Sequence, residues 1–304
     1  MSRLSKFTVV SVVVSLSASL LSVPMASASA PVAVAGQESR RGGHTAENKA
    51  LVTSFYDQLF NNGDLSVIDK YVSAAYIQHN PFAADGPEAL RALVAGQKKA
   101  FPQSHNTIKR VVAQGDLVLI HSHSQLTPGA AGTEVTDIFR VSKGKLVEHW
   151  DTLQPVPTST ASGNDLFSTL SGRSTPGSAA LTLVSEWTVL NYFTRLNNDH
   201  DLRAVDRSVS RSLYQHDPLL TNGSAAVKAA YAKDFATNPS SIVSKPLVVA
   251  EGDLVAVRYH YQKNAADLGQ AITEIFRVQH GKIVEHWSAT QNVPATSAND
   301  NTMF

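Results

Sequence analysis

Cysteine is absent from this chain of 304 residues, and charged residues make up only 17% of it. The absence of cysteine excludes disulfides, thiolate nucleophiles, iron–sulfur clusters and cysteine-ligated zinc. The formal net charge is +1, and no run of Lys or Arg forms a basic patch, so nucleic acid is not an expected partner. Any catalysis therefore uses histidine, carboxylate or hydroxyl groups, or a metal site without thiolates.

Three catalytic motifs are also missing: the Gly-x-Ser-x-Gly nucleophile elbow, the glycine-rich phosphate loop and the His-Glu-x-x-His zinc motif. What the chain does have is apolar content, at 43% of its residues. This is enough to pack the core of one large domain or two ordinary ones, and it excludes low-complexity disorder.

The N-terminus has the pattern of a secretory signal peptide. Arg3 and Lys6 precede an apolar run over residues 7–23, which is diluted only by small polar residues. That run is barely long enough to span a bilayer, which favours cleavage over a retained membrane anchor.

Small residues follow this run and fit the A-x-A cleavage pattern, with cleavage after Ala28 or after Ala30. We therefore expect a signal peptide over residues 1–30 and a flexible leader over residues 31–44. The expected product is secreted or associated with the cell envelope and has no membrane contact after cleavage.

An internal repeat is the strongest feature of the sequence. Residues 111–118 return as residues 248–255, and residues 138–141 return as residues 275–278 at the same offset of 137. Chance does not keep such a register along a chain, so the protein contains two copies of one domain.

The repeat places the first copy at residues 45–157 and the second at residues 180–304. Residues 158–179 between them are rich in Ser, Thr and Gly and are expected to form a linker. The C-terminal residues 298–304 have a shortened counterpart in residues 163–167, so the linker is partly the first copy's own C-terminal extension.

Within a copy, helical periodicity comes before strand patterns. In the first copy the patterns predict helices over 51–60, 65–72 and 87–101 and strands over 107–113, 117–126, 134–141 and 146–153. Tight turns are expected at Gly115-Asp116 and Lys143-Gly144. Each copy is therefore expected to be an α+β domain with N-terminal helices packed on a curved antiparallel sheet.

Two motifs carry a family resemblance. Residues 78–81 (Gln-His-Asn-Pro) and 144–151 (Gly-Lys-Leu-Val-Glu-His-Trp-Asp) recur in the second copy as residues 215–218 and 281–287. The chain resembles the SnoaL-like polyketide cyclase branch of the NTF2-like superfamily over nearly all of both copies. The resemblance implies two tandem cone-shaped NTF2-like domains, each with an internal pocket and paired with each other as an intramolecular pseudo-dimer. Members of the family include cyclases, isomerases, epoxide hydrolases and dehydratases, so the fold does not identify a reaction.

Asp137 and Asp151 are the first candidates for chemistry. Asp137 lies within the apolar segment 135–139, where a carboxylate is costly to bury unless it is partnered or protonated, a state that suits a proton donor. Asp151 lies two residues after His149, so both project from one side of the last strand. The resemblance places a pocket acid at each aspartate position, whereas the alternatives are a solvent-facing acid for Asp137 and core packing for His149. The second copy has Ser288 in place of Asp151.

The remaining histidines suggest the walls of a pocket. The resemblance places His79 at the pocket mouth beside a ligand or a carboxylate, and the alternative is a structural histidine that bonds loop backbone. His121 and His123 share one strand face, but the second copy has Arg258 in place of His121, and arginine disfavours a metal site. We therefore expect no metal, and we assign these positions to a substrate pocket: His121, His123, His216, Arg258, His260, Glu274 and His286.

These residues support two hypotheses. In the first, Asp151 and Asp137, with His79 or His149, act as a lyase, cyclase or isomerase without a cofactor on a small apolar oxygenated molecule. In the second, the protein is a secreted module that binds a small ligand without catalysis. Both hypotheses have a small-molecule partner.

The signal peptide assignment can be checked on the exported protein. When the whole chain is expressed in a secreting bacterial host, the mature protein is expected to begin at Ser29 or Pro31. Intact-mass spectrometry of the medium and cell-envelope fractions distinguishes the two sites. A chain that keeps residues 1–30 and stays in the membrane fraction would contradict the assignment.

Overall fold

The structure is a computed structural model that describes residues 44–170 and 178–304. The predicted signal peptide, nearly all of the predicted leader and residues 171–177 of the predicted linker lie outside the described residues. The described residues contain no helix that is long and apolar enough to cross a membrane.

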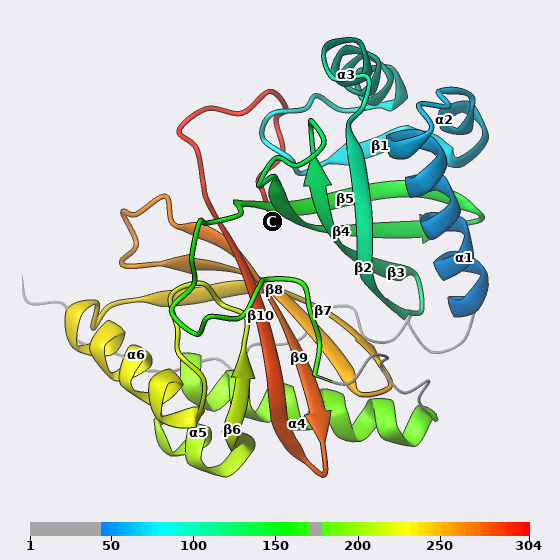
Figure 1. The fold of residues 1–304 in the computed structure, drawn as a ribbon. Coiled ribbons are helices and arrows are strands. Elements are labelled where there is room, and N and C mark those ends of the chain that lie inside the picture. Colours follow the sequence, from blue (N-terminus) through cyan, green and yellow to red (C-terminus); the bar gives the residue numbers. More distant parts are fainter. Residues whose placement is uncertain (1–43, 171–177) are drawn as a thin grey trace, which may run out of the picture. The chain divides into compact units, whose positions relative to one another are not determined.

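The first domain consists of helices followed by a five-stranded sheet (Figure 1). Its sheet has the strand order β1-β5-β4-β3-β2. The elements are α1 (Thr45–Tyr56), the π-helix η2 (Asp57–Asn61), α2 (Ser66–Tyr71), β1 (Val72–Gln78), α3 (Pro87–Ala100), β2 (His105–Gln114), β3 (Leu117–Gln125), β4 (Thr133–Ser142) and β5 (Lys145–Pro155).

The second domain repeats this order, and its sheet has the equivalent strand order β6-β10-β9-β8-β7. Its elements are α4 (Ala179–Asn197), α5 (Arg203–Ser208), β6 (Val209–Gln215), α6 (Ser224–Thr237), β7 (Ile242–Glu251), β8 (Leu254–Gln262), β9 (Gln270–Gln279) and β10 (Lys282–Asn292). The predicted fold class, two tandem α+β domains of the NTF2-like type, is confirmed.

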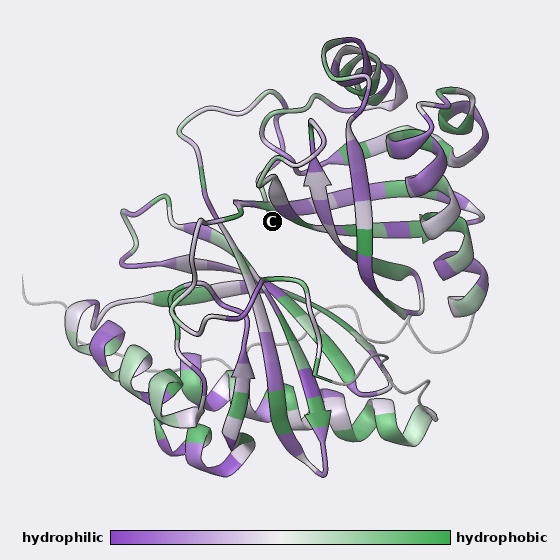
Figure 2. Cartoon of the chain, viewed as in Figure 1, coloured by the Kyte–Doolittle hydropathy of each residue, from purple (hydrophilic) through white to green (hydrophobic). Residues whose placement is uncertain are grey.

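One face of each sheet packs on the helices to form the domain core. In the first domain, Phe55 and Leu59 of the first helix and η2 are fully buried against Val118 and Phe139 of the sheet. The second domain has an equivalent core around α4. Figure 2 shows apolar and polar residues alternating along many of the strands, as expected when the two faces have different environments.

The sequence patterns missed one strand in each domain. Residues 72–78 form β1, which pairs in parallel with β5 and changes register between Val72 and Ile77. The prediction ended a helix at residue 72 and assigned no strand after it. The strand is short and irregular, and its partner lies about seventy residues further along the chain, so no local pattern marks it.

Tight turns set the register of the strands that carry the site. Lys143 and Gly144 both have positive φ, at 51° and 70°, which is the conformation of a two-residue type I′ hairpin. The turn joins β4 to β5, and a register shift between Arg140 and Val141 then places Asp137 directly opposite Asp151. The tight turn expected at Lys143-Gly144 is therefore confirmed.

The other faces of the two sheets share an apolar cluster. It contains Leu119, Ile138 and Trp150 of the first domain together with Ile275 and Trp287 of the second. Thr152 and Thr273 are hydrogen-bonded within this region, with 2.9 Å between their hydroxyl oxygens. The strands are therefore buried on both faces, which explains why their sequences contain continuous apolar runs.

Each domain also receives the C-terminal extension of the other. Asn164, which follows β5, donates from Nδ2 to the Gln215 carbonyl at 2.9 Å. Asn301, at the same position after β10, donates from Nδ2 to the Gln78 carbonyl at 3.0 Å and to the Asp85 carboxylate at 2.9 and 3.1 Å. The exchange is reciprocal, and in Figure 1 the red C-terminal segment runs back from β10 to the first domain.

Removing one of these contacts tests whether the exchanged extension stabilises the protein. The Asn301→Ala substitution is expected to lower the free energy of unfolding by about 1–2 kcal/mol, because it removes the side-chain donor to the Gln78 carbonyl and leaves the Asp85 carboxylate with only the backbone N–H of Gln78 as a donor. Chemical denaturation of the mature chain measures the change. The exposed neighbour Asp300 provides the control, since Asp300→Ala is expected to stay within about 0.5 kcal/mol of the wild type. Equal effects of the two substitutions would show that the docked extension contributes nothing.

Candidate functional site

A cavity of about 280 Å³ lies between the helices and the inner face of the first sheet. Aromatic and aliphatic side chains form most of its wall: Phe55, Phe60, Phe82, Leu90, Leu93, Val135, Phe139 and Leu153. Its titratable members are Tyr56, Tyr76, Asp137, His149 and Asp151. The cavity therefore combines an apolar wall with a small polar cluster, as expected for a small-molecule site.

Strand alternation brings the polar cluster together. Asp137 on β4 faces the cavity with Val135 and Phe139, and His149 and Asp151 face it from β5. Asp137 and Asp151 are direct cross-strand neighbours, and both are nearly completely buried. Asp137, His149 and Asp151, three of the four residues predicted to carry the chemistry, thus line one cavity.

The protonation of His149 follows from its neighbours. The backbone N–H of Asn80 donates to Gln78 Oε1 at 2.9 Å, which identifies this atom as an acceptor. His149 Nδ1 lies 2.8 Å from the same Oε1 and must therefore carry a proton. The other ring nitrogen, Nε2, lies 3.0 Å from Asp137 Oδ1.

Asp137 and His149 consequently share one proton. Either an imidazolium donates from Nε2 to the Asp137 carboxylate, or a neutral imidazole accepts from the protonated carboxyl group. The pair can transfer this proton to a ligand and take it back. Such a pair is suited to general acid catalysis.

Asp151 is positioned as the proton acceptor. Asn80 Nδ2 donates to its Oδ2 at 2.5 Å, while Oδ1 is buried and has no hydrogen-bond partner among the described residues. Burial raises the pKa of Asp151 above its usual value, nearby His149 opposes this effect, and Asp137 adds to it. A buried carboxylate with a free oxygen and a raised pKa is a stronger base than an exposed aspartate.

The same three residues are the only group of metal-ligand type found in the described ranges. One ligand atom each from Asp137, His149 and Asp151 lies within 4.8 Å of the other two. Two carboxylates and an imidazole match a divalent cation in chemical type. Both aspartates already accept hydrogen bonds here, from His149 or Asn80, so proton sharing and metal binding compete for the same atoms.

His79 lies outside this cavity. Its Nδ1 is 2.6 Å from the Thr302 carbonyl oxygen of the docked C-terminal extension, and its Nε2 is 3.0 Å from Glu148. The ring also stacks on Trp150 with 4.9 Å between centroids. His79 thus contacts a carboxylate, as the resemblance implied, but it holds the extension and does not line the cavity.

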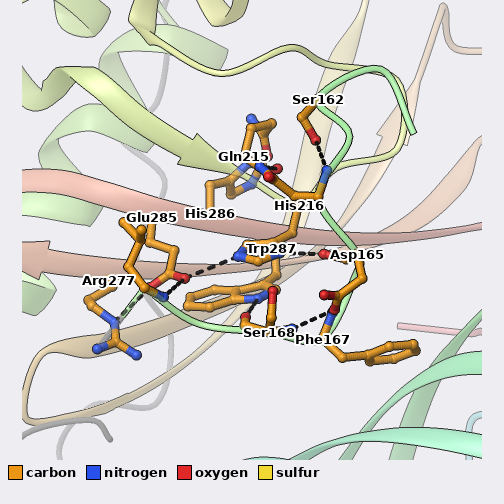
Figure 3. A network of polar contacts seen from close by, with 12 residues as sticks. Ser162, Asp165, Phe167, Ser168, Gln215, His216, Arg277, Glu285, His286 and Trp287 are labelled. Carbon is orange, nitrogen blue, oxygen red and sulfur yellow. Dashed lines mark hydrogen bonds and ion pairs between the residues drawn. The ribbon is translucent and has the colours of Figure 1, made fainter. Parts of the chain in front are cut away.

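His216 has the equivalent position in the second domain (Figure 3). Its Nδ1 faces the Asp165 carbonyl oxygen at 2.5 Å, its Nε2 lies 3.0 Å from Glu285, and its ring stacks on Trp287. Arg277 completes the network through an ion pair of 3.0 Å with Glu285. The two residues of the His-Trp motif therefore lie on opposite faces of the last strand. The histidine faces the cavity, and the tryptophan faces the exchanged extension.

The structure corrects the placement of the other predicted pocket residues. His121 and His123 lie on the outer face of β3, because Ser122 between them faces inward and bonds the Tyr56 hydroxyl at 2.9 Å. His121 is fully buried there against Glu134, with 2.8 Å between Nε2 and the carboxylate. His123 lies 2.7 Å from the Ala131 carbonyl and stacks on Phe167.

Arg258 and His260 follow the same pattern on β8. Arg258 donates to the backbone carbonyl of Asp151 at 2.9 Å, and His260 stacks on Phe304. Of the predicted pocket residues in the second copy, Glu274 and His286 line a cavity. The error has a physical origin: both faces of these strands are buried, so hydrophobicity does not reveal which face is inside.

Sequence reasoning missed Gln78 and Asn80, which orient His149 and Asp151. Both belong to the Gln-His-Asn-Pro motif that recurs in the second copy, so the repeat contained the signal. Gln78 and Asn80 do not titrate, so the search for acid and base groups singled out His79 in that motif and not the two amides beside it.

Comparisons with known proteins support the same assignment of both domains. Residues 52–149 match a family model described as a SnoaL-like domain, and residues 188–298 match one described as a SnoaL-like polyketide cyclase. No curated protein matches the chain.

Solved structures also resemble single domains of the chain. A SnoaL-like polyketide cyclase from Agrobacterium tumefaciens is 16% identical, with 35% of this chain and 91% of that chain covered and a TM-score of 0.31. IdmH from Streptomyces antibioticus is 21% identical, with coverages of 35% and 91% and a TM-score of 0.30. AclR from Streptomyces galilaeus is 26% identical, with coverages of 36% and 81% and a TM-score of 0.31.

The raised pKa of Asp151 has a consequence for stability. A carboxyl group whose pKa is higher in the folded than in the unfolded chain stabilises the fold fully below its unfolded value of 3.8, and this stabilisation is lost as the pH rises through the folded pKa. The change in free energy of unfolding caused by Asp151→Asn is therefore expected to be more favourable to the folded protein at about pH 7 than at about pH 4.

Denaturant unfolding at the two pH values measures this difference, with Asp300→Asn as the exposed control. The control is expected to change stability by less than about 0.5 kcal/mol at both pH values. An Asp151→Asn variant that is less stable than the wild type at neutral pH, and not at acidic pH, would contradict the analysis of this site.

Proposed function

The chain belongs to the SnoaL-like family in tandem duplication, and we propose that its first domain is an acid/base catalyst that needs no cofactor. Its substrate is a small apolar molecule with a carbonyl group, and its reaction is a proton transfer next to that carbonyl, as in a lyase, cyclase or isomerase. The observation that carries the proposal is the shared proton of Asp137 and His149 beside the free Oδ1 of Asp151 in one apolar cavity.

The geometry assigns a role to each group. Asp151 takes a proton from the carbon next to the carbonyl, and the electron pair of that C–H bond moves to the carbonyl oxygen. The Asp137–His149 pair donates its hydrogen bond to the enolate oxygen that develops. The proton then returns from Asp151 to carbon. Alternatively, the enolate carbon attacks a second carbonyl of the same molecule, and the oxygen of that second carbonyl takes up the proton from Asp151 and becomes a hydroxyl group.

The surroundings of the two acids favour this division. Asn80 holds Asp151 as an acceptor, and Gln78 holds the His149 proton on Nδ1. The apolar wall excludes water from the enolate, which strengthens the hydrogen bond that stabilises it. A cavity of about 280 Å³ fits a molecule of one or two rings.

Two further proposals concern the setting of this activity. The protein acts outside the cytoplasm, as the N-terminal pattern over residues 1–30 suggests. The two domains work as an intramolecular pseudo-dimer, and the shared apolar cluster around Trp150 and Trp287 and the reciprocal extensions support this proposal.

Hydrogen–deuterium exchange tests the proton transfer without knowledge of the natural substrate. The mature chain is expected to accelerate loss of the α-proton signals of 2-tetralone in deuterated buffer, followed by NMR. The Asp151→Asn substitution is expected to lower the contribution of the first domain by about 10²–10⁴-fold. The exposed Glu88→Gln variant serves as the control and is expected to keep the wild-type rate.

Three outcomes would contradict the proposal. Exchange that the Asp151→Asn and Asp137→Asn variants leave unchanged would remove the catalytic assignment. Exchange that EDTA abolishes and a divalent cation restores would replace it with metal-assisted chemistry at the same three residues. Saturable binding of the ketone without any exchange would favour the alternative of a ligand-binding module.

A further inference from the structure

The second domain has a cavity of its own, of about 230 Å³, between its sheet and α4 to α6. Glu274 and His286 line it from β9 and β10, at the positions that Asp137 and His149 have in the first domain. Four tyrosines also line it: Tyr192, Tyr231, Tyr259 and Tyr261. The cavity is therefore similar in size to the first and richer in phenolic groups.

An acid–histidine pair lies at equivalent positions in the two domains. The backbone N–H of Asp217 donates to Gln215 Oε1 at 2.9 Å, so this atom accepts. His286 Nδ1 lies 2.9 Å from the same oxygen and therefore carries a proton, and its Nε2 lies 3.3 Å from Glu274 Oε1. Glu274 and His286 therefore form an ion pair at the positions of Asp137 and His149, but without the hydrogen bond of the first domain, so His286 Nε2 has no hydrogen-bond partner among the described residues.

The proton acceptor is in a different place. Ser288 has the position of Asp151, opposite Glu274, and a serine hydroxyl does not accept a proton near neutral pH. In the first domain the neighbour of Asp151 is Asn80, and the equivalent of Asn80 is Asp217. The amide of Asn80 is thus replaced by the carboxylate of Asp217, and the carboxylate of Asp151 is replaced by the hydroxyl of Ser288.

The local backbone shows that Asp217 is oriented like Asn80. Asn80 Oδ1 accepts from the N–H of Phe82 at 2.7 Å, and Asp217 Oδ1 accepts from the N–H of Leu219 at 2.7 Å. The same short turn therefore fixes both side chains and directs their second polar atom toward β5 or β10. There Asn80 donates to Asp151, and Asp217 lies near Ser288, which lowers the Asp217 pKa.

We propose that the cavity of the second domain is a second proton-transfer site, in which Asp217 is the base and the Glu274–His286 pair is the acid. The proposal rests on the proposed function of the first domain and extends it to the second domain, where Ser288 in place of Asp151 would otherwise indicate that no base is present. Asp217 takes a proton from the carbon next to a carbonyl, the electron pair of that C–H bond moves to the carbonyl oxygen, and the Glu274–His286 pair donates a hydrogen bond to that oxygen. Return of the proton from Asp217 to carbon closes the cycle.

The groups around Asp217 agree with this role. Burial raises its pKa, His286 opposes the effect, Glu274 adds to it, and the hydrogen bond from Ser288 lowers it. Asp217 shares the cavity with Tyr231 of α6. Burial raises the pKa of this phenol well above its usual value, so the phenol stays neutral. Asp234, the other acid that lines the cavity, is bonded to the Tyr261 hydroxyl at 2.8 Å.

The two sites are expected to prefer different molecules of one chemical class. Asp151 reaches its cavity from a strand in the sheet, whereas Asp217 reaches its own from the loop after β6. A base that approaches from another side removes a different proton of a bound ring. The four tyrosines of the second cavity also offer more hydrogen-bond donors, which suits a more highly oxygenated ligand.

The second site can be tested in a chain whose first base is removed. The Asp151→Asn variant is expected to keep residual exchange of 2-tetralone and of its hydroxylated analogue 6-hydroxy-2-tetralone above the buffer rate. Adding Asp217→Asn is expected to lower this residual rate by about tenfold or more, whereas adding the exposed control Asp300→Asn is expected to leave it unchanged. Circular dichroism verifies that each variant is folded.

The outcomes separate this proposal from the function of the first domain. A drop from wild type to Asp151→Asn tests the first site, and the further drop on adding Asp217→Asn tests the second. The second site is overturned if Asp151→Asn already exchanges at the buffer rate with both ketones, or if Asp217→Asn changes nothing. A carboxyl NMR titration gives a reading independent of any ketone. Asp217 is expected to titrate above 3.8 and to move higher in Ser288→Ala, and an ordinary value in both chains would contradict its role.

Discussion

The alternation of side chains along the last strand of each domain is the constraint on which the rest of the structure depends. On β5, His149 and Asp151 face the cavity, while Glu148 and Trp150 contact His79, which binds the docked extension. On β10 the same alternation separates His286 from Trp287. Because successive residues of a strand point to opposite faces, four adjacent residues can form a reaction site and an anchoring site at once.

This constraint makes buried charge tolerable. Isolated carboxylates are costly in an apolar cavity, but Asp137 shares a proton with His149, and Asp151 accepts from Asn80. The amide of Gln78 orients the histidine and thereby fixes which nitrogen faces the acid. The polar cluster is therefore supported from β1 and its following loop, the part of the sheet that has no local sequence pattern.

Duplication allowed the two domains to diverge within the same frame. The acid–histidine pair and its glutamine are present in both, while the second cavity carboxylate is Asp151 on the last strand in one domain and Asp217 in the loop after β6 in the other. The anchoring network diverged less, since His79 and His216 each contact an acid, a tryptophan and the extension of the other domain. The contacts that join the domains are thus more uniform than the cavities.

The sequence by itself determined the duplication, the α+β class and the turns, and it identified Asp137, His149 and Asp151 as candidates for the site. Repeats, glycines with positive φ and apolar neighbours at a spacing of two are local signals, and these features depend on them. Tertiary structure alone decided that His121 and Arg258 lie between the sheets, that His79 anchors an extension, and that Asn80 and Asp217 exchange roles with residues of the last strand. These features depend on which face of a doubly buried strand meets the other domain and on contacts between residues more than sixty positions apart, and neither is encoded in a local pattern.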